Sequence, residues 1–171
     1  MGRLAEGDHA PDFDLSSTED AVLMLRDEVP RSAVLLYFFA DPADERVRRD
    51  LSAMAARRDD FGRLGLKVMG ISPAKMDGLK AAQHELGLPF PLLVDDRGFS
   101  RSYGVDASDD ETPEPALVLV DRGQKVLWVG NPAPAFEQAA SGILGRLKSL
   151  PSATANYPRS VINRLVDRWV N

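Results

Sequence analysis

The run AVLLYFF at residues 33–39 is followed by DPAD at residues 41–44. A continuous apolar run of this kind is typical of a strand buried on both faces of a sheet. The DPAD sequence is typical of a helix start, because Asp41 can cap the first turn and Pro42 suits the first helical position. The stretch therefore predicts a buried strand that leads directly into a helix.

Strands and helices are expected to alternate along the rest of the chain. The helix that begins near Pro42 is expected to end at Gly62 or Gly65. After it, apolar patterns bounded by turn residues predict strands at 66–71, 91–94, 116–120 and 125–129. Two further helices are expected, one from Ser72-Pro73 to about Leu86 and one over 134–147. This order predicts an α/β sandwich in which helices flank a central mixed sheet. We expect one domain over residues 1–150.

Residues 151–171 are expected to form a linker and a final amphipathic helix. Over residues 158–170, one helical stripe carries only apolar side chains, namely Val161, Ile162, Leu165, Val166 and Trp169. Such a stripe needs a surface to pack on. That surface belongs either to the chain's own domain or to a partner, a second copy of the chain included.

Composition excludes several classes of protein. The chain has 171 residues, a net charge of −5 and no cysteine, and the apolar run 33–40 is far below the roughly 20 residues that cross a bilayer. We therefore expect no nucleic-acid partner and no membrane association. His9 and His84 stand far apart without ligand spacing, so no metal and no cofactor are expected. We expect a cytoplasmic location, because residues 1–13 contain no apolar signal core.

Six short phrases occur in a fixed order along residues 7–123. They read GDHAPDFDL at 7–15, LYFF at 36–39, GIS at 70–72, LPFPLLVD at 88–95, YGV at 103–105 and VLVDRG at 118–123. In this order the phrases resemble the peroxiredoxins of the alkyl hydroperoxide reductase/thiol-specific antioxidant (AhpC/TSA) family. The resemblance covers about residues 4–148 and implies the thioredoxin-like fold of peroxiredoxins. It also implies a homodimer, which the final helix would join or brace.

The catalytic residues of that family are not found in this chain. The family motif Pro-x-x-x-Thr-x-x-Cys falls on Ala40, Asp44 and Val47, and the family's activating arginine falls on Pro115. Peroxide reduction requires a thiolate stabilised by a helix N-terminus and a nearby cation. Valine cannot supply a thiolate. The chain acting alone is therefore predicted to be inert as a thiol peroxidase, with these four positions as a vestigial site.

The candidate binding groove comprises Asp41, Asp44, Arg48 and Pro115. Arginines recur at positions 46, 48, 49, 57 and 58, which predicts either a solvated face, with Asp44 and Arg48 as a pair, or a site for an anion or acidic partner. Pro115 falls where thioredoxins carry a cis-proline. We expect a cis Glu114–Pro115 bond there, the alternative being a trans proline that ends an acidic loop.

Two functions remain open at this point. The first is a degenerate, non-catalytic peroxiredoxin-like protein that binds or regulates, with another protein or an anionic ligand as its partner. The alternative is an antioxidant oxidoreductase that reduces peroxides with a thiol supplied by a partner, as the family resemblance implies. The missing cysteine favours the first.

Overall fold

A computed structural model describes residues 4–96, 98–104 and 114–149 of the chain. The predicted linker and helix of residues 151–171 lie outside the described residues, as does most of the acidic loop before Glu114. Among the described helices, none is long and apolar enough to cross a membrane. The elements run in the order β1 Asp14–Ser16, β2 Val22–Met24, α1 Leu25–Glu28, β3 Ala33–Phe38, α2 Glu45–Ala56, α3 Arg58–Arg63, β4 Leu66–Ser72, α4 Met76–Leu86, β5 Leu92–Val94, the 3₁₀ helix η1 Phe99–Tyr103, β6 Ala116–Val120, β7 Val126–Gly130 and α5 Phe136–Ser149.

The central sheet has five strands in the order β5-β4-β3-β6-β7. Strand β3 lies in the middle, parallel to β4 and antiparallel to β6. All six of its residues are buried. The prediction of a mixed sheet with the AVLLYFF run in its interior is confirmed.

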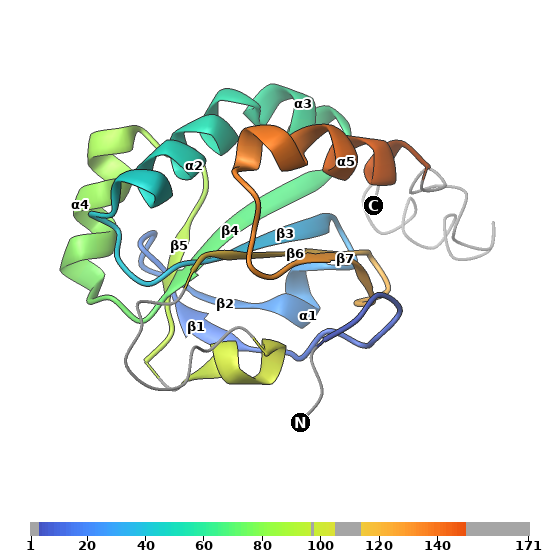
Figure 1. The fold of residues 1–171 in the computed structure, drawn as a ribbon. Coiled ribbons are helices and arrows are strands. Elements are labelled where there is room, and N and C mark those ends of the chain that lie inside the picture. The colour runs from blue at the N-terminus through green and yellow to red at the C-terminus, as the bar shows by residue number, and fades with distance from the viewer. Residues whose placement is uncertain (1–3, 97, 105–113, 150–171) are drawn as a thin grey trace, which may run out of the picture.

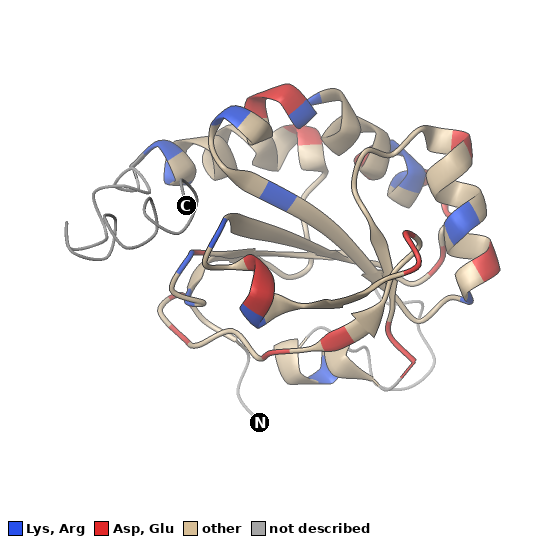
Figure 2. Cartoon of the chain, turned by 180° about the vertical axis from the view of Figure 1, so that it is seen from behind, with Lys and Arg blue, Asp and Glu red and all other residues tan. Residues whose placement is uncertain are grey.

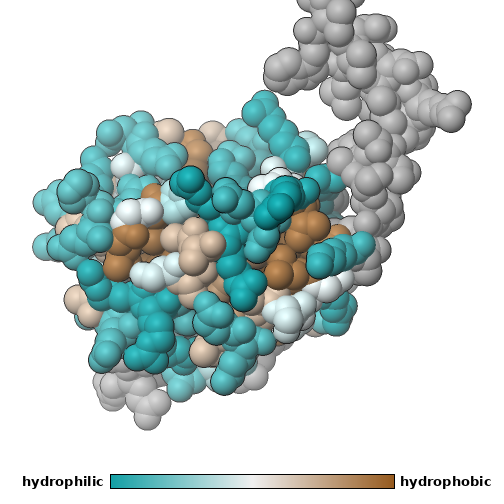
Figure 3. Space-filling view, turned by 90° about the horizontal axis from the view of Figure 1, so that it is seen from above, coloured by the Kyte–Doolittle hydropathy of each residue, from teal (hydrophilic) through white to brown (hydrophobic). Residues whose placement is uncertain are grey.

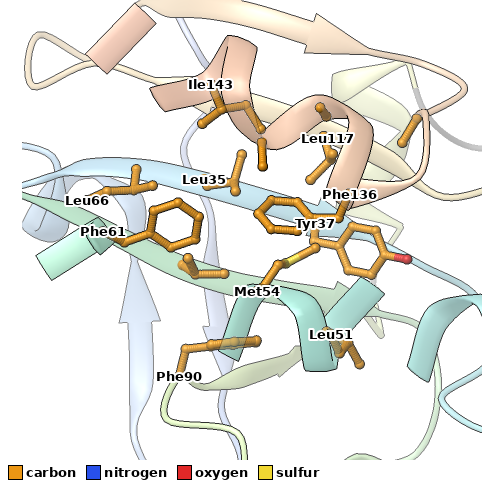
Figure 4. Packing of buried hydrophobic residues seen from close by; sticks show 14 of the residues in the cluster. Leu35, Tyr37, Leu51, Met54, Phe61, Leu66, Phe90, Leu117, Phe136 and Ile143 are labelled. Atoms are coloured by element: carbon orange, nitrogen blue, oxygen red, sulfur yellow. The ribbon is translucent and has the colours of Figure 1, made fainter. Parts of the chain in front are cut away.

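Alternate side chains of β3 point into two separate cores, one on each face of the sheet. Leu35 and Tyr37 belong to the core under α2, α3, α4 and α5, and part of its packing is shown in Figure 4. Leu36 and Phe38 belong to the core on the opposite face, where the N-terminal residues and η1 cover the sheet (Figure 1). A strand that is covered on both sides has no face for polar residues, which explains the uninterrupted apolar run.

The N-terminal part of the chain forms a two-stranded hairpin, β1–β2, that the sequence analysis did not predict. Its strands have three residues each and pair antiparallel. Phe13 and Leu15 are buried against the sheet, and Thr18 bonds to β5 through its backbone N–H, which donates to the carbonyl of Leu92. The hairpin therefore closes the face of the sheet that the long helices leave open.

Several helix boundaries differ from the prediction. Helix α2 begins at Glu45, with Asp44 as its N-cap, rather than near Pro42. The predicted long helix is two helices, α2 and α3, which meet at Arg57. Ser72 ends β4 instead of capping a helix, and α4 begins at Met76. The hydroxyl of Ser72 donates to the carbonyl of Ala40 at 3.0 Å, so it joins the ends of β3 and β4.

Candidate functional site

The turn after β3 holds its shape through two carboxylates. Oδ1 of Asp41 accepts a hydrogen bond from the backbone N–H of Ala43 at 2.8 Å. Oδ1 of Asp44 accepts one from the backbone N–H of Val47 at 3.1 Å. Asp41 therefore closes the turn and Asp44 caps α2, so the capping role predicted for Asp41 is wrong. Each carboxylate has a second oxygen that these bonds leave unused.

A pocket of about 260 Å³ opens where this turn faces the segment before β6. Its lining consists of the residues at the three motif positions and four neighbours: Ala40, Asp41, Asp44, Arg46, Val47, Glu114 and Pro115. All four vestigial positions therefore meet in one pocket, although Pro115 is far from the others in sequence. Three of the four candidate groove residues line the pocket, and Arg48 is the exception.

Arg48 points away from the pocket toward α4. Its guanidinium lies 3.0 Å from the Glu85 carboxylate, in place of the predicted pair with Asp44. Other arginines of α2, of α3 and of the junction between them are also paired: Arg49 with Glu45, Arg57 with Glu137, and Arg58 with Asp59. Acidic and basic segments therefore share the helices, as Figure 2 shows. This arrangement matches the predicted solvated face better than an anion site, but of these pairs only Arg49–Glu45 has the predicted i,i+4 spacing.

The position of the family's nucleophile is an apolar wall of the pocket. Val47 is 3% exposed and belongs to the core under the helices, which confirms the predicted burial. Pro115 is also buried, and its carbonyl accepts a hydrogen bond from the backbone N–H of Ala133 at 2.7 Å. The expectation of a cis Glu114–Pro115 bond is wrong, because the cis bond found among the described residues is Asn131–Pro132.

A buried carboxylate that the sequence analysis missed supports the pocket from behind. Asp50 of α2 is 3% exposed, and its oxygens accept hydrogen bonds from the hydroxyl of Tyr37 at 2.8 Å and from the backbone N–H of Phe136 at 3.0 Å. It therefore connects β3, α2 and the start of α5. Its signal was in the sequence, because an aspartate at the helical spacing of Val47, Leu51 and Met54 falls on the core-facing stripe.

Arg46 connects this buried cluster to the pocket. Its guanidinium lies 3.6 Å from Oδ2 of Asp50 and donates a hydrogen bond to the carbonyl of Ala133. Burial, with the Asp50 carboxylate close by, raises the pKa of Tyr37 well above its usual range. The Tyr37 hydroxyl therefore stays protonated as a hydrogen-bond donor. Arg46 is the cation among the described lining residues, and the buried carboxylate of Asp50 already balances its charge.

The described residues give the pocket carboxylates and no sulfur nucleophile. Its described lining offers three exposed carboxylates, from Asp41, Asp44 and Glu114, but no thiol, hydroxyl or imidazole. Over residues 4–96, 98–104 and 114–149, no group of three or more His, Cys, Asp or Glu side chains could hold a metal ion. Negative charge here would raise the pKa of a thiol, the opposite of what peroxide reduction requires.

Comparison with known sequences places this site in a family context. The AhpC/TSA family pattern matches residues 6–129. Two Mycobacterium tuberculosis sequences assigned as peroxiredoxins, from strains CDC 1551 and H37Rv, are each 34% identical to this chain over 103 residues, or 60% of its length. The match spans 65% of the length of these relatives.

Solved structures show the same fold. Peroxidoxin BcpB from Mycobacterium tuberculosis superimposes with a TM-score of 0.80 at 19% identity, over 88% of this chain and 100% of that one. A cysteine-to-serine mutant of PrxQ from Xylella fastidiosa gives a TM-score of 0.78 at 16% identity, over 87% and 98%. A structure from Chlorobium tepidum assigned as the thiol:disulfide interchange protein DsbE gives 0.70 at 27% identity, over 84% and 99%. The thioredoxin-like, peroxiredoxin-type fold is therefore confirmed.

Proposed function

The chain belongs to the AhpC/TSA family, and we propose that it is a non-catalytic member, a binding or regulatory protein that receives a positively charged group in its vestigial pocket. The observation that carries this proposal is the pocket wall itself. A buried valine stands where the nucleophile of the family falls, and carboxylates surround the opening. With no cysteine in the chain, no other residue can supply a thiolate.

The charge of the ligand follows from which groups are already used. Asp41 and Asp44 each accept a hydrogen bond from a backbone N–H with one carboxylate oxygen, and these bonds leave the second oxygen unused. Glu114 is exposed at the opening. Arg46 is held by Asp50 and the carbonyl of Ala133. An anion would therefore meet three carboxylates and a cation that is already paired, whereas an ammonium or guanidinium group would find partners. Of the two partners that the sequence left open, another protein or an anionic ligand, we propose the first, with a lysine or arginine side chain as the group that enters the pocket.

A peroxide-consumption assay tests the absence of catalysis. The purified chain, with hydrogen peroxide or an organic hydroperoxide, is expected to give no consumption above the protein-free rate, with or without added dithiol or thioredoxin. Val47→Cys restores a thiol but leaves Asp44 and Pro115 in place of the threonine and arginine, so little turnover is expected from it too. Turnover by the unmodified chain with an added thiol would establish the alternative antioxidant function instead.

A binding experiment tests the charge of the ligand. Calorimetry with an oligo-arginine and an oligo-glutamate peptide is expected to show binding of the basic peptide alone. Asp41→Asn with Glu114→Gln should abolish this binding. The matched control, Asp59→Asn with Asp60→Asn, removes the same charge from α3, outside the pocket. If both double variants bind the basic peptide equally, the attraction comes from net charge and the pocket is not the site.

A further inference from the structure

A second cavity lies at the other end of α2, away from the vestigial pocket. It has a volume of about 290 Å³, and its lining comprises Met54, Phe61, Leu66, Val68, Phe90, Pro89, Pro91, Arg58, Asp59, Gly62 and Lys67. We call this cavity the β4 groove. Its apolar side chains come from α2, α3, β4 and the residues before β5, and Figure 4 shows Met54, Phe61, Leu66 and Phe90 among the packed side chains of the core. From above, apolar surface appears among hydrophilic residues over the helix layer (Figure 3).

The groove exists because the neighbouring strand is short. Strand β5 pairs only with Gly70–Ser72, so the first half of β4 has no described strand beside it on this side. The carbonyl of Pro91 accepts a hydrogen bond from the backbone N–H of Gly70 at 3.1 Å, and there the pairing ends. Pro89 and Pro91 lack the N–H that would extend the ladder along β4. The edge therefore stays open next to an apolar cavity.

The chain carries a segment whose chemistry suits this groove. Residues 150–171 follow α5 and contain the apolar stripe of Val161, Ile162, Leu165, Val166 and Trp169. They also carry three arginines and one aspartate, a net charge of +2, so the rest of the chain carries −7 against −5 for the whole. The net charges attract the segment to the domain as a whole, but they do not select the groove, whose charged lining residues are Arg58, Lys67 and Asp59. Burial of the stripe, which removes apolar surface from water, favours the groove.

The connection is long enough for the segment to reach the groove. Helix α5 ends at Ser149, and its final turns lie over the same end of the sheet as α3 in both Figure 1 and Figure 2. Eleven residues, 150–160, separate that end from Val161. At about 3.3 Å per extended residue they span up to roughly 36 Å, close to the width of a domain of this size. We propose that residues 161–169 dock in the β4 groove of their own chain.

Quenching of Trp169 fluorescence tests the proposal in the full-length chain. Trp128→Phe leaves Trp169 as the sole tryptophan, and the absence of native cysteines allows one nitroxide label to be attached at Asp59→Cys on the groove rim. The side chain of Asp59 is 84% exposed, so the label can be tolerated. We expect the label to remove most of the Trp169 emission. The matched control is the same label at Glu45→Cys, at the opposite end of α2, which should leave the emission unchanged.

A blocking substitution separates docking in the groove from chance proximity. A Cβ at Gly62 would meet no atom within 4 Å, so Gly62→Leu fills the groove mouth without disturbing the core. It should restore the emission, whereas Gly142→Leu, at an equally open glycine of α5, should not. Emission unaffected by the label at Asp59→Cys, or unaffected by Gly62→Leu, would overturn the proposal. Quenching that grows with protein concentration would overturn it too, because it would place the segment on a second copy.

Discussion

Replacing Asp50, which supports the pocket from behind, by alanine should strongly destabilise the protein. Asp50 is buried and accepts hydrogen bonds from the Tyr37 hydroxyl and the Phe136 N–H. Asp50→Ala leaves both buried donors without a partner, and each unsatisfied donor costs about 1–3 kcal/mol. The ion pair with Arg46 adds little, because that side chain is 36% exposed and the distance is 3.6 Å.

The expected loss in the free energy of unfolding is about 3–4 kcal/mol, within the range measured when one partner of a buried polar contact is removed. Urea unfolding followed by circular dichroism measures it. With a urea dependence of about 2 kcal/mol per molar, the midpoint should fall by roughly 1.5–2 M. Asp50→Asn is the informative comparison, because the amide oxygen of the new side chain can still accept a hydrogen bond from one of the two donors. We expect Asp50→Asn to lose only about 1 kcal/mol.

Asp59→Ala serves as the control for loss of an aspartate from the same helical layer. Its side chain is exposed, so its unfolding free energy should stay within about 0.5 kcal/mol of the wild type. If Asp50→Ala unfolds at the same urea concentration as Asp59→Ala, the buried carboxylate does not hold β3, α2 and α5 together. The account of how the pocket wall is supported would then be wrong.

Two further results are expected. Burial raises the pKa of Tyr37 and Tyr103 above their ordinary value of 10, so the folded state holds these protons more tightly than the unfolded state. The free energy of unfolding should therefore fall as pH rises above 10. Absorbance at alkaline pH should show both tyrosines ionising only as the protein unfolds, and titration of Tyr37 or Tyr103 in the folded chain near pH 10 would contradict this. Light scattering of the full-length chain should give twice the 18.7 kDa of one chain if the homodimer implied by the family forms, whereas a single-chain mass at high concentration would exclude it.

The sequence was sufficient for the sheet and for the missing chemistry. A seven-residue apolar run is typical of a strand covered on both faces, and β3 lies at the centre of the sheet. The absence of cysteine excludes a thiolate whatever the fold. The buried central strand and the missing thiolate can both be inferred from residue types alone. Neither inference requires knowledge of which residues from distant parts of the chain come into contact.

Local capping was harder to predict, because several residues compete for the same role. Asp41 and Asp44 are both good caps, and the choice depends on where β3 ends and how the turn closes onto Ser72. Ser72 itself has the sequence of a helix cap, yet its hydroxyl bonds to Ala40 across the sheet. The sequence showed that a turn and a helix follow each of the parallel strands β3 and β4, and contacts between strands decided the residue at which each helix begins.

Long-range partners were decided by the tertiary structure alone. Arg48 could pair with Asp44 one helical turn away, but α4 places the Glu85 carboxylate 3.0 Å from the Arg48 guanidinium. Glu85 is 37 residues from Arg48 in the chain, so a local sequence pattern cannot predict this pair. In the same way, Pro115 reaches the pocket because β6 lies beside β3, and Asp50 finds its donors on β3 and at the start of α5. The sequence therefore determined which strand is buried on both faces and which chemistry is absent. The packing of elements distant in the chain determined the charge of the pocket, because that charge depends on which ionised groups already have a partner.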